Sequence, residues 1–259
     1  MISEESLKAK ARELLDVYCV DSVDEFEIDD IANAEGLIIQ EEQMGNHQGR
    51  INHKGDYGII TLNKLITNTN FRRIIIAHEM GHFYSMRKYK RCSTADIHAY
   101  KPNQNDEYIS NVFANEFLMP EEWFINFTRK TNPDIQLLKD IANYFQVTLS
   151  AASYRYSSLG KYPVAIIMSK GGKVVWNSIS KDFPYQFVRI GLKVNQYSNA
   201  YNYFHGKPIE IGEHEVMAES WFSEDFNFRR NIFFMEENFV MNNLGAVLTI
   251  IKENVRIFK

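Results

Sequence analysis

The sequence predicts an α+β protein with a helix-rich first part and a strand-rich second part. Three observations lead to this fold class. Apolar residues recur at helical spacing in several segments before residue 160. Short runs rich in Val and Ile, separated by glycine turns, follow after it. Two such runs also lie between helices of the first part, so each part combines helix with strand.

The chain changes character near residue 160, where Pro163 leads into the first of the later strands. We therefore predict three regions. Residues 1–133 form a mixed domain, residues 134–160 form a small helical subdomain, and residues 161–259 form a second α+β domain. Scattered aromatic residues in the last region are typical of a packed core.

Local signals predict the elements in order. Ser3 is a suitable N-cap for a helix over 3–17, and Gly36 ends a second helix over 26–36. Strands are predicted at 37–43 and, around a Lys54-Gly55-Asp56 turn, within 49–63. The later expectations are helices over 71–90, 105–119 and 121–130, two helices joined at 146–148, a hairpin over 164–179, and strands within 207–222 and 245–254.

Composition excludes several classes of protein. The 45% apolar content is enough for a sizeable core, and the net charge of −4 gives no general attraction to nucleic acid or anionic membrane. No apolar run approaches the roughly 20 residues that span a bilayer, and the N-terminus lacks the apolar core of a signal peptide. Cys19 and Cys92 are far apart and read as free thiols. We expect a cytoplasmic protein without membrane contact.

Residues His78-Glu79-Met80-Gly81-His82 carry the HExxH motif of zinc peptidases. On a helix, residues four apart share one face, so both imidazoles can reach a single ion. Glu79 is rotated about the helix axis and can face a metal-activated water as general base. The apolar residues 74–77 before the motif favour this interpretation over two chance histidines on an exposed helix.

A catalytic zinc usually has three protein ligands and one open position. Glu107 on the later helix is the predicted third ligand, and Asn111, one turn on, is predicted to hydrogen-bond a ligand. Alternative carboxylate or imidazole ligands are Asp96, His98, Asp106 and Glu116. One Zn²⁺ per chain is expected, although a His/His/Glu set is not selective for zinc by ligand type alone.

The HEMGH block and a second block resemble the ImmA/IrrE metallopeptidases, which are regulators of bacteria and mobile elements. The second block has the pattern E-x-x-x-N-x-F-A-x-x-F-L-M-P and consists of Glu107, Asn111, Phe113, Ala114, Phe117, Leu118, Met119 and Pro120. Ser110 stands where alanine is usual, and Phe117 where leucine is commoner. The resemblance covers about residues 25–160.

This resemblance implies a minimal zincin-like fold, with zinc held by His78, His82 and Glu107 and with Glu79 catalytic. It also implies a protein substrate, a helix-turn-helix transcriptional repressor that is cut to relieve repression. By analogy with one branch of the family, residues 161–259 are expected to form a GAF-like domain that senses a signal or binds a partner.

Three weaker signals accompany this interpretation. His98 and Tyr100 lie between the ligand helices and are candidates for stabilising the oxyanion of the transition state. Residues 134–160 have the outline of a DNA-binding helix-turn-helix, but the second helix has Arg155 as its one basic residue, so no direct contact with nucleic acid is expected. The remaining rival is a zinc-structured anti-repressor that binds a repressor without cutting it.

Overall fold

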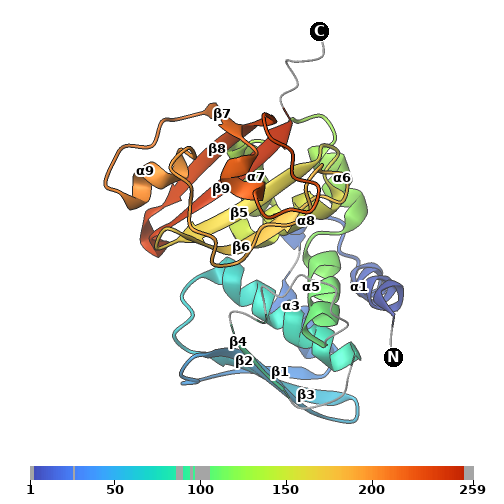
Figure 1. The fold of residues 1–259 in the computed structure, drawn as a ribbon. Coiled ribbons are helices and arrows are strands. Elements are labelled where there is room, and N and C mark those ends of the chain that lie inside the picture. Colours follow the sequence, from blue (N-terminus) through green and yellow to red (C-terminus); the bar gives the residue numbers. More distant parts are fainter. Residues whose placement is uncertain (1–2, 26, 86–89, 94–95, 97–105, 254–259) are drawn as a thin grey trace. The chain divides into compact units, whose positions relative to one another are not determined.

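The computed structural model describes residues 3–25, 27–85, 90–93, 96 and 106–253. These residues form two compact units, one made of residues 1–124 and 141–151 and the other of residues 125–140 and 152–259. Both units contain a β-sheet and helices, which confirms the predicted α+β class (Figure 1). Because the units interleave within residues 125–151, the domain limits at 133 and 160 stay predictions.

The first unit contains a four-stranded sheet in the order β1-β3-β2-β4. Strand β1 pairs with β3 in parallel, whereas β2 pairs with β3 and with β4 in antiparallel fashion. The strands are β1 (Leu37–Glu42), β2 (His47–Lys54), β3 (Tyr57–Asn63) and β4 (Lys90–Ser93). The predicted Lys54-Gly55-Asp56 turn is confirmed between β2 and β3, with Gly55 at a φ of 64° that suits glycine.

Helices α1 (Glu4–Val17), α2 (Ile28–Ala34), α3 (Thr69–Ser85) and α5 (Asp106–Leu118) accompany this sheet. Helix α3 packs on β2 and β3, α5 packs along α3, and α1 packs on α5 (Figure 1). Every residue of α3 from Arg73 to His82 is buried. A helix enclosed on all sides removes its polar side chains from water, so those side chains need partners inside the unit.

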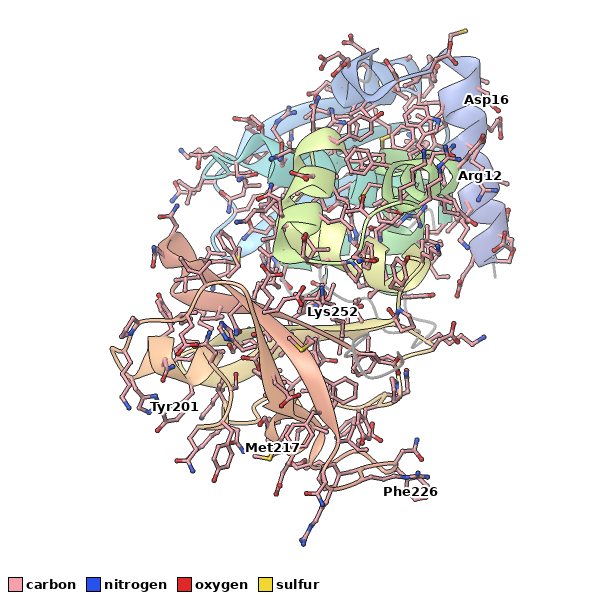
Figure 2. The ribbon with its side chains drawn as sticks, turned by 90° about the horizontal axis from the view of Figure 1, so that it is seen from above. Arg12, Asp16, Tyr201, Met217, Phe226 and Lys252 are labelled. Atoms are coloured by element: carbon pink, nitrogen blue, oxygen red, sulfur yellow. The ribbon has the colours of Figure 1, made fainter. Side chains whose placement is uncertain are left out.

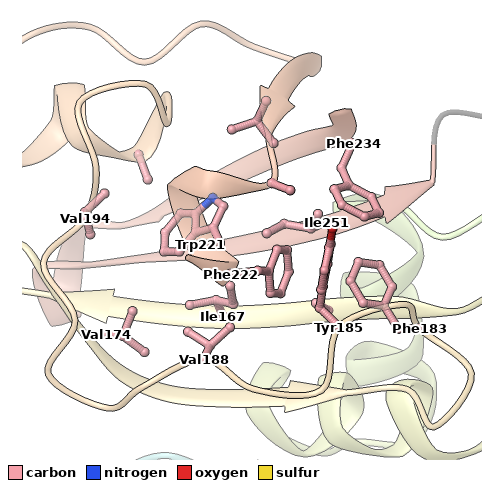
Figure 3. Close-up of a cluster of buried hydrophobic side chains, with 14 of the residues drawn as sticks. Ile167, Val174, Phe183, Tyr185, Val188, Val194, Trp221, Phe222, Phe234 and Ile251 are labelled. Carbon is pink, nitrogen blue, oxygen red and sulfur yellow. The ribbon is translucent and has the colours of Figure 1, made fainter. Parts of the chain in front are cut away.

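The second unit contains a five-stranded sheet in the order β6-β5-β9-β8-β7, with antiparallel pairing throughout. The strands are β5 (Val164–Lys170), β6 (Lys173–Ile179), β7 (Glu213–Met217), β8 (Phe233–Met241) and β9 (Ala246–Glu253). The short helices α9 (Ala200–Phe204) and α10 (Glu219–Phe222) follow the strands. Trp221 and Phe222 of α10 pack with Ile167 and Ile251 of the sheet in one apolar cluster (Figure 3).

Three further helices are divided between the units, namely α6 (Glu121–Thr128), α7 (Ile135–Tyr144) and α8 (Leu149–Leu159). Their positions agree with the predicted helices, and α7 and α8 are joined at residues 145–148. A helix-turn-helix identity for this pair and a GAF-like identity for the second unit stay predictions. No helix within the described ranges is both long and apolar enough to cross a membrane.

Two predicted elements require correction. The helix expected over 71–90 ends at Ser85 in the described chain, and Lys90 begins strand β4 instead. The segment 207–222 was expected as strand, but only Glu213–Met217 pairs in the sheet, and Glu219–Phe222 forms a helical turn. Strand β8 had no sequence prediction. It pairs with β9 across the short connection at Asn242–Leu244 and with β7, and its sequence FFMEENFVM does not alternate between apolar and polar residues.

Candidate metal centre

Helix α3 places the two histidines of the HEMGH motif one turn apart and buries both. His78 is fully buried and His82 is 1% exposed. Their rings lie edge to face with centroids 4.7 Å apart, and the two Nε2 atoms are 3.1 Å apart. Two imidazole nitrogens at this separation can share one ion, as the i, i+4 spacing predicted.

Helix α5 brings Glu107 to the same point because α3 and α5 approach closely at Gly81. A Cβ atom built at Gly81 would stand 2.6 Å from the carbonyl oxygen of Ser110, so only glycine fits this approach. Glu107 Oε2 is consequently 3.0 Å from His78 Nε2 and 3.4 Å from His82 Nε2. The predicted third ligand therefore lies with the two histidines.

A fourth potential ligand, Cys92 of β4, joins this cluster. Its Sγ atom is 3.3 Å from Nε2 of His78, 3.3 Å from Nε2 of His82 and 3.8 Å from Oε2 of Glu107. The four donor atoms lie within 4.8 Å of one another and all four residues are buried. The sequence predicts a free thiol at Cys92, because no ligand spacing links this residue to the HEMGH motif.

Asn111 fixes the orientation of the His78 ring. Its Oδ1 lies 2.8 Å from His78 Nδ1, and its Nδ2 donates to the backbone oxygen of Asp96 at 3.0 Å. Since Oδ1 is the acceptor atom of Asn111, His78 Nδ1 carries a proton, and in the neutral ring Nε2 has the lone pair, which is directed into the cluster. The predicted contact between Asn111 and a ligand residue is thus present in the structure.

The electrostatics of the cluster are those of a site built around a cation. Burial alone lowers the pKa of His78, but the hydrogen bond to Glu107 and the charges of Glu79 and Glu107 raise it above its ordinary value. Burial, the charges of Glu79 and Glu107 and a hydrogen bond to Glu79 together raise the pKa of the Cys92 thiol. Carboxylates concentrated in this enclosed space favour a positive charge at their centre.

Glu79, the predicted general base, is fully buried on α3 beside this cluster. Strand β2 accommodates it at Gly49, where a Cβ atom would stand 2.7 Å from Glu79 Oε1 and 2.6 Å from Ile75 Cγ2. A β-bulge interrupts the pairing of β2 with β4 between His47 and Gly49. Bulges next to functional sites redirect side chains, and here the bulge lies opposite Cys92.

The other predicted ligands lie elsewhere. Glu116 accepts a hydrogen bond of 2.7 Å from Arg12 of α1, which is labelled in Figure 2. Asp96 accepts from the backbone nitrogen and hydroxyl of Ser93 at 2.8 and 2.7 Å. His98 and Tyr100, the candidate oxyanion donors, lie outside the described residues, as does the side chain of Asp106.

Comparison with known proteins supports the same interpretation. The family model of Peptidase M78, described as the IrrE N-terminal-like domain, matches residues 32–157. A search of the curated proteins finds no match. Among solved structures, a Mycobacterium tuberculosis transcriptional regulator is similar with a TM-score of 0.56 and 12% identity, over 96% of this chain and 76% of that chain. This similarity concerns the fold.

The donor set fits a divalent metal. Two imidazole nitrogens, a carboxylate oxygen and a thiol sulfur are the ligand types that zinc prefers. The matched residues 32–157 contain all four donors together with Glu79 and Asn111. Residues 32–157 therefore match the IrrE N-terminal-like domain of Peptidase M78, and this match supports an ImmA/IrrE family protein.

Proposed function

We propose that this protein is a zinc-dependent endopeptidase that cuts a helix-turn-helix transcriptional repressor and thereby relieves repression. The observation that carries the reaction is the meeting of His78, His82 and Glu107 in one buried cluster, with Glu79 buried beside it. The substrate class follows from family membership, and the reaction follows from the chemistry of the cluster.

When bound by these three residues, zinc would polarise a peptide carbonyl and lower the pKa of a water toward about 7. Glu79 then takes the proton of the attacking water and passes it to the leaving amine. Asn111 holds the tautomer of His78 that keeps Nε2 free for a metal. The surrounding apolar residues of α3 exclude bulk water, which strengthens each of these electrostatic interactions. His98 and Tyr100 are proposed as oxyanion donors.

The test is incubation of the zinc-loaded protein with a candidate helix-turn-helix repressor, followed by mass spectrometry of the fragments. Glu79→Gln is expected to abolish cleavage and to retain one zinc per chain, since it removes the base and no ligand. Glu122→Gln, which changes an exposed carboxylate on α6, is the matched control and should cleave at the wild-type rate. Cleavage by Glu79→Gln at the wild-type rate would refute the assignment of the base.

A second candidate function is a zinc-structured anti-repressor that binds without cutting, and the presence of a fourth donor in Cys92 favours it. In that case the repressor would co-purify with the protein uncut, and Glu79→Gln would leave binding unchanged. Direct DNA binding by residues 134–160 is less favoured, because Arg155, the one basic residue of α8, is only 5% exposed.

A further inference from the structure

Cys92 Sγ is one of the four donor atoms that make up the candidate metal centre. The side chain is fully buried, and its strand β4 pairs with β2 so that Cys92 stands opposite Gly49. The neighbouring Ser93 hydrogen-bonds Asp96, whose backbone oxygen accepts from Asn111 of α5. The strand that carries the thiol is therefore connected to the helix that carries Glu107.

The four donor atoms have the geometry of a tetrahedron. Zinc bonds of about 2.0–2.1 Å to nitrogen or oxygen and about 2.3 Å to sulfur imply edges of about 3.4–3.6 Å between ligand atoms. The six separations in the cluster are 3.0, 3.1, 3.3, 3.3, 3.4 and 3.8 Å. In a square-planar set, two of the six separations would be diagonals about 40% longer than the sides. No two of the separations in the cluster are longer than the others by that much.

A tetrahedral set with four protein ligands has no position left for water. Structural zinc sites are closed in this way, whereas catalytic sites have three protein ligands and an open fourth position. Gly49, the β2 residue that pairs with Cys92, lies against Glu79, since a Cβ atom there would stand 2.7 Å from Glu79 Oε1. Glu79, the group that would take a proton from water, therefore lies on the side of the cluster where Cys92 stands.

We propose that Cys92 is the fourth ligand of the metal and that it keeps the peptidase latent until its sulfur leaves the ion. The ligation concerns the metal alone, whereas the latency rests on the proposed peptidase function. A coordinating thiol is bound as thiolate, so the closed site has two imidazoles, one carboxylate and one thiolate. Departure of Sγ exposes the corner beside Glu79 to water and substrate.

Ligation is tested on the full chain loaded with Co²⁺, which reports a bound thiolate through a sulfur-to-cobalt charge-transfer band in the near ultraviolet. The wild type should show this band, and Cys92→Ala and Cys92→Ser should lack it. Zinc affinity, measured by competition with a chelating dye, should fall at least about tenfold in both variants, since even outer partners of ligands contribute that much.

The matched control is Cys19→Ala, which removes the exposed cysteine at the end of α1 and should retain both the band and the affinity. Thermal unfolding with and without zinc shows whether each variant is folded. A wild type that lacks the band and binds zinc as tightly as folded Cys92→Ser would overturn the ligation, and Cys92 would then be a neighbour of an open three-ligand site.

Latency is tested by the hydrolysis of fluorescently labelled casein, an unstructured protein. Zinc-loaded Cys92→Ala should cleave it at least about tenfold faster than the wild type, and the double variant with Glu79→Gln should not cleave it. Equal cleavage by the wild type and Cys92→Ala would overturn the latency and leave the peptidase in place. If no protein cleaves casein or repressor while the cobalt band behaves as expected, the ligation stands and the latency falls with the peptidase function.

Discussion

Gly81 and Ser110 are in contact through their backbones, and this contact sets the distance between α3 and α5. A Cβ atom at Gly81 would lie 2.6 Å from the carbonyl oxygen and 2.8 Å from the Cα atom of Ser110. Both partners of the clash are backbone atoms, so neither can turn away as a flexible side chain would. The absence of a side chain at Gly81 therefore allows α3 and α5, the two helices that supply the three predicted ligands, to approach this closely.

Gly81→Ala should consequently separate α3 from α5 and move Glu107 away from the histidines. Overpacking of this kind costs about 1–3 kcal/mol, even though alanine favours a helix more than glycine does. We expect a lower melting temperature without metal and a loss of most bound zinc, measured by calorimetry and elemental analysis. Ser110→Ala is the matched control, because the contact involves only the Ser110 backbone. Full zinc content in Gly81→Ala would show that the helix spacing is not critical.

Asn111→Leu should weaken zinc binding without removing a ligand. The variant loses the acceptor for His78 Nδ1 and the donor to the Asp96 backbone. Loss of such a partner of a ligating histidine typically lowers metal affinity by about 10–100-fold. Asn111→Asp keeps the acceptor and should recover most of the affinity in the same chelator competition. Equal affinity of Asn111→Leu and the wild type would contradict the orienting role.

Two helices end in a left-handed residue that is not glycine. Cys19 and Gln146 both have φ of 52°, in Schellman-type ends where Val20 N donates to Leu15 O and Val147 N donates to Ala142 O. The left-handed conformation costs a residue with a side chain about 1–2 kcal/mol relative to glycine. Glycine loses part of this advantage because its unfolded state is more flexible.

Cys19→Gly and Gln146→Gly should therefore each raise the free energy of unfolding by up to about 1 kcal/mol, as measured by urea denaturation. Gly36, which already holds the corresponding position after α2 at φ of 78°, provides the reverse control. Gly36→Ala should destabilise the protein, and its Cβ would additionally meet the Asp56 carbonyl oxygen at 2.9 Å. Lower stability of both glycine variants would disprove the argument.

Arg12→Ala should destabilise the first unit more than loss of an ordinary surface ion pair. Glu116 has no exposed side-chain surface, and its Oε1 accepts from Arg12 Nε at 2.7 Å and from the Glu121 backbone at 3.3 Å. Since Arg12 is half-exposed, we expect a loss of about 1–3 kcal/mol, less than for a fully buried pair. Lys8→Ala, which removes an exposed pair with Glu5 on the same helix, should cost less than about 0.5 kcal/mol.

The sequence allowed the HEMGH ligands, Glu107 and Asn111 to be predicted because each is set by helical periodicity over four residues. Cys92 could not be predicted in this way. It reaches the cluster through the pairing of β4 with β2, some forty residues earlier in the chain, and β4 is only four residues long. A short strand without alternation gives no local signal, and a lone cysteine has no spacing to test.

The same distinction applies to the second unit. The β5–β6 hairpin was predicted from its glycine turn, and β9 from its apolar run, because both signals are local. The order of the strands depends on contacts between distant segments. The central position of β9 between β5 and β8 could therefore not be derived from the pattern of any single segment.

That central position determines the order in which a growing chain can complete its sheets. Strand β9 pairs with β5 from Val164↔Lys252 to Lys170↔Ala246, so about eighty residues are synthesised between the two partners. All four strands of the first sheet precede residue 94, whereas β5 and β8 have no common neighbour until residues 246–253 emerge. A chain that stops short of β9 thus contains every residue of the candidate metal centre but lacks the central strand of its second sheet.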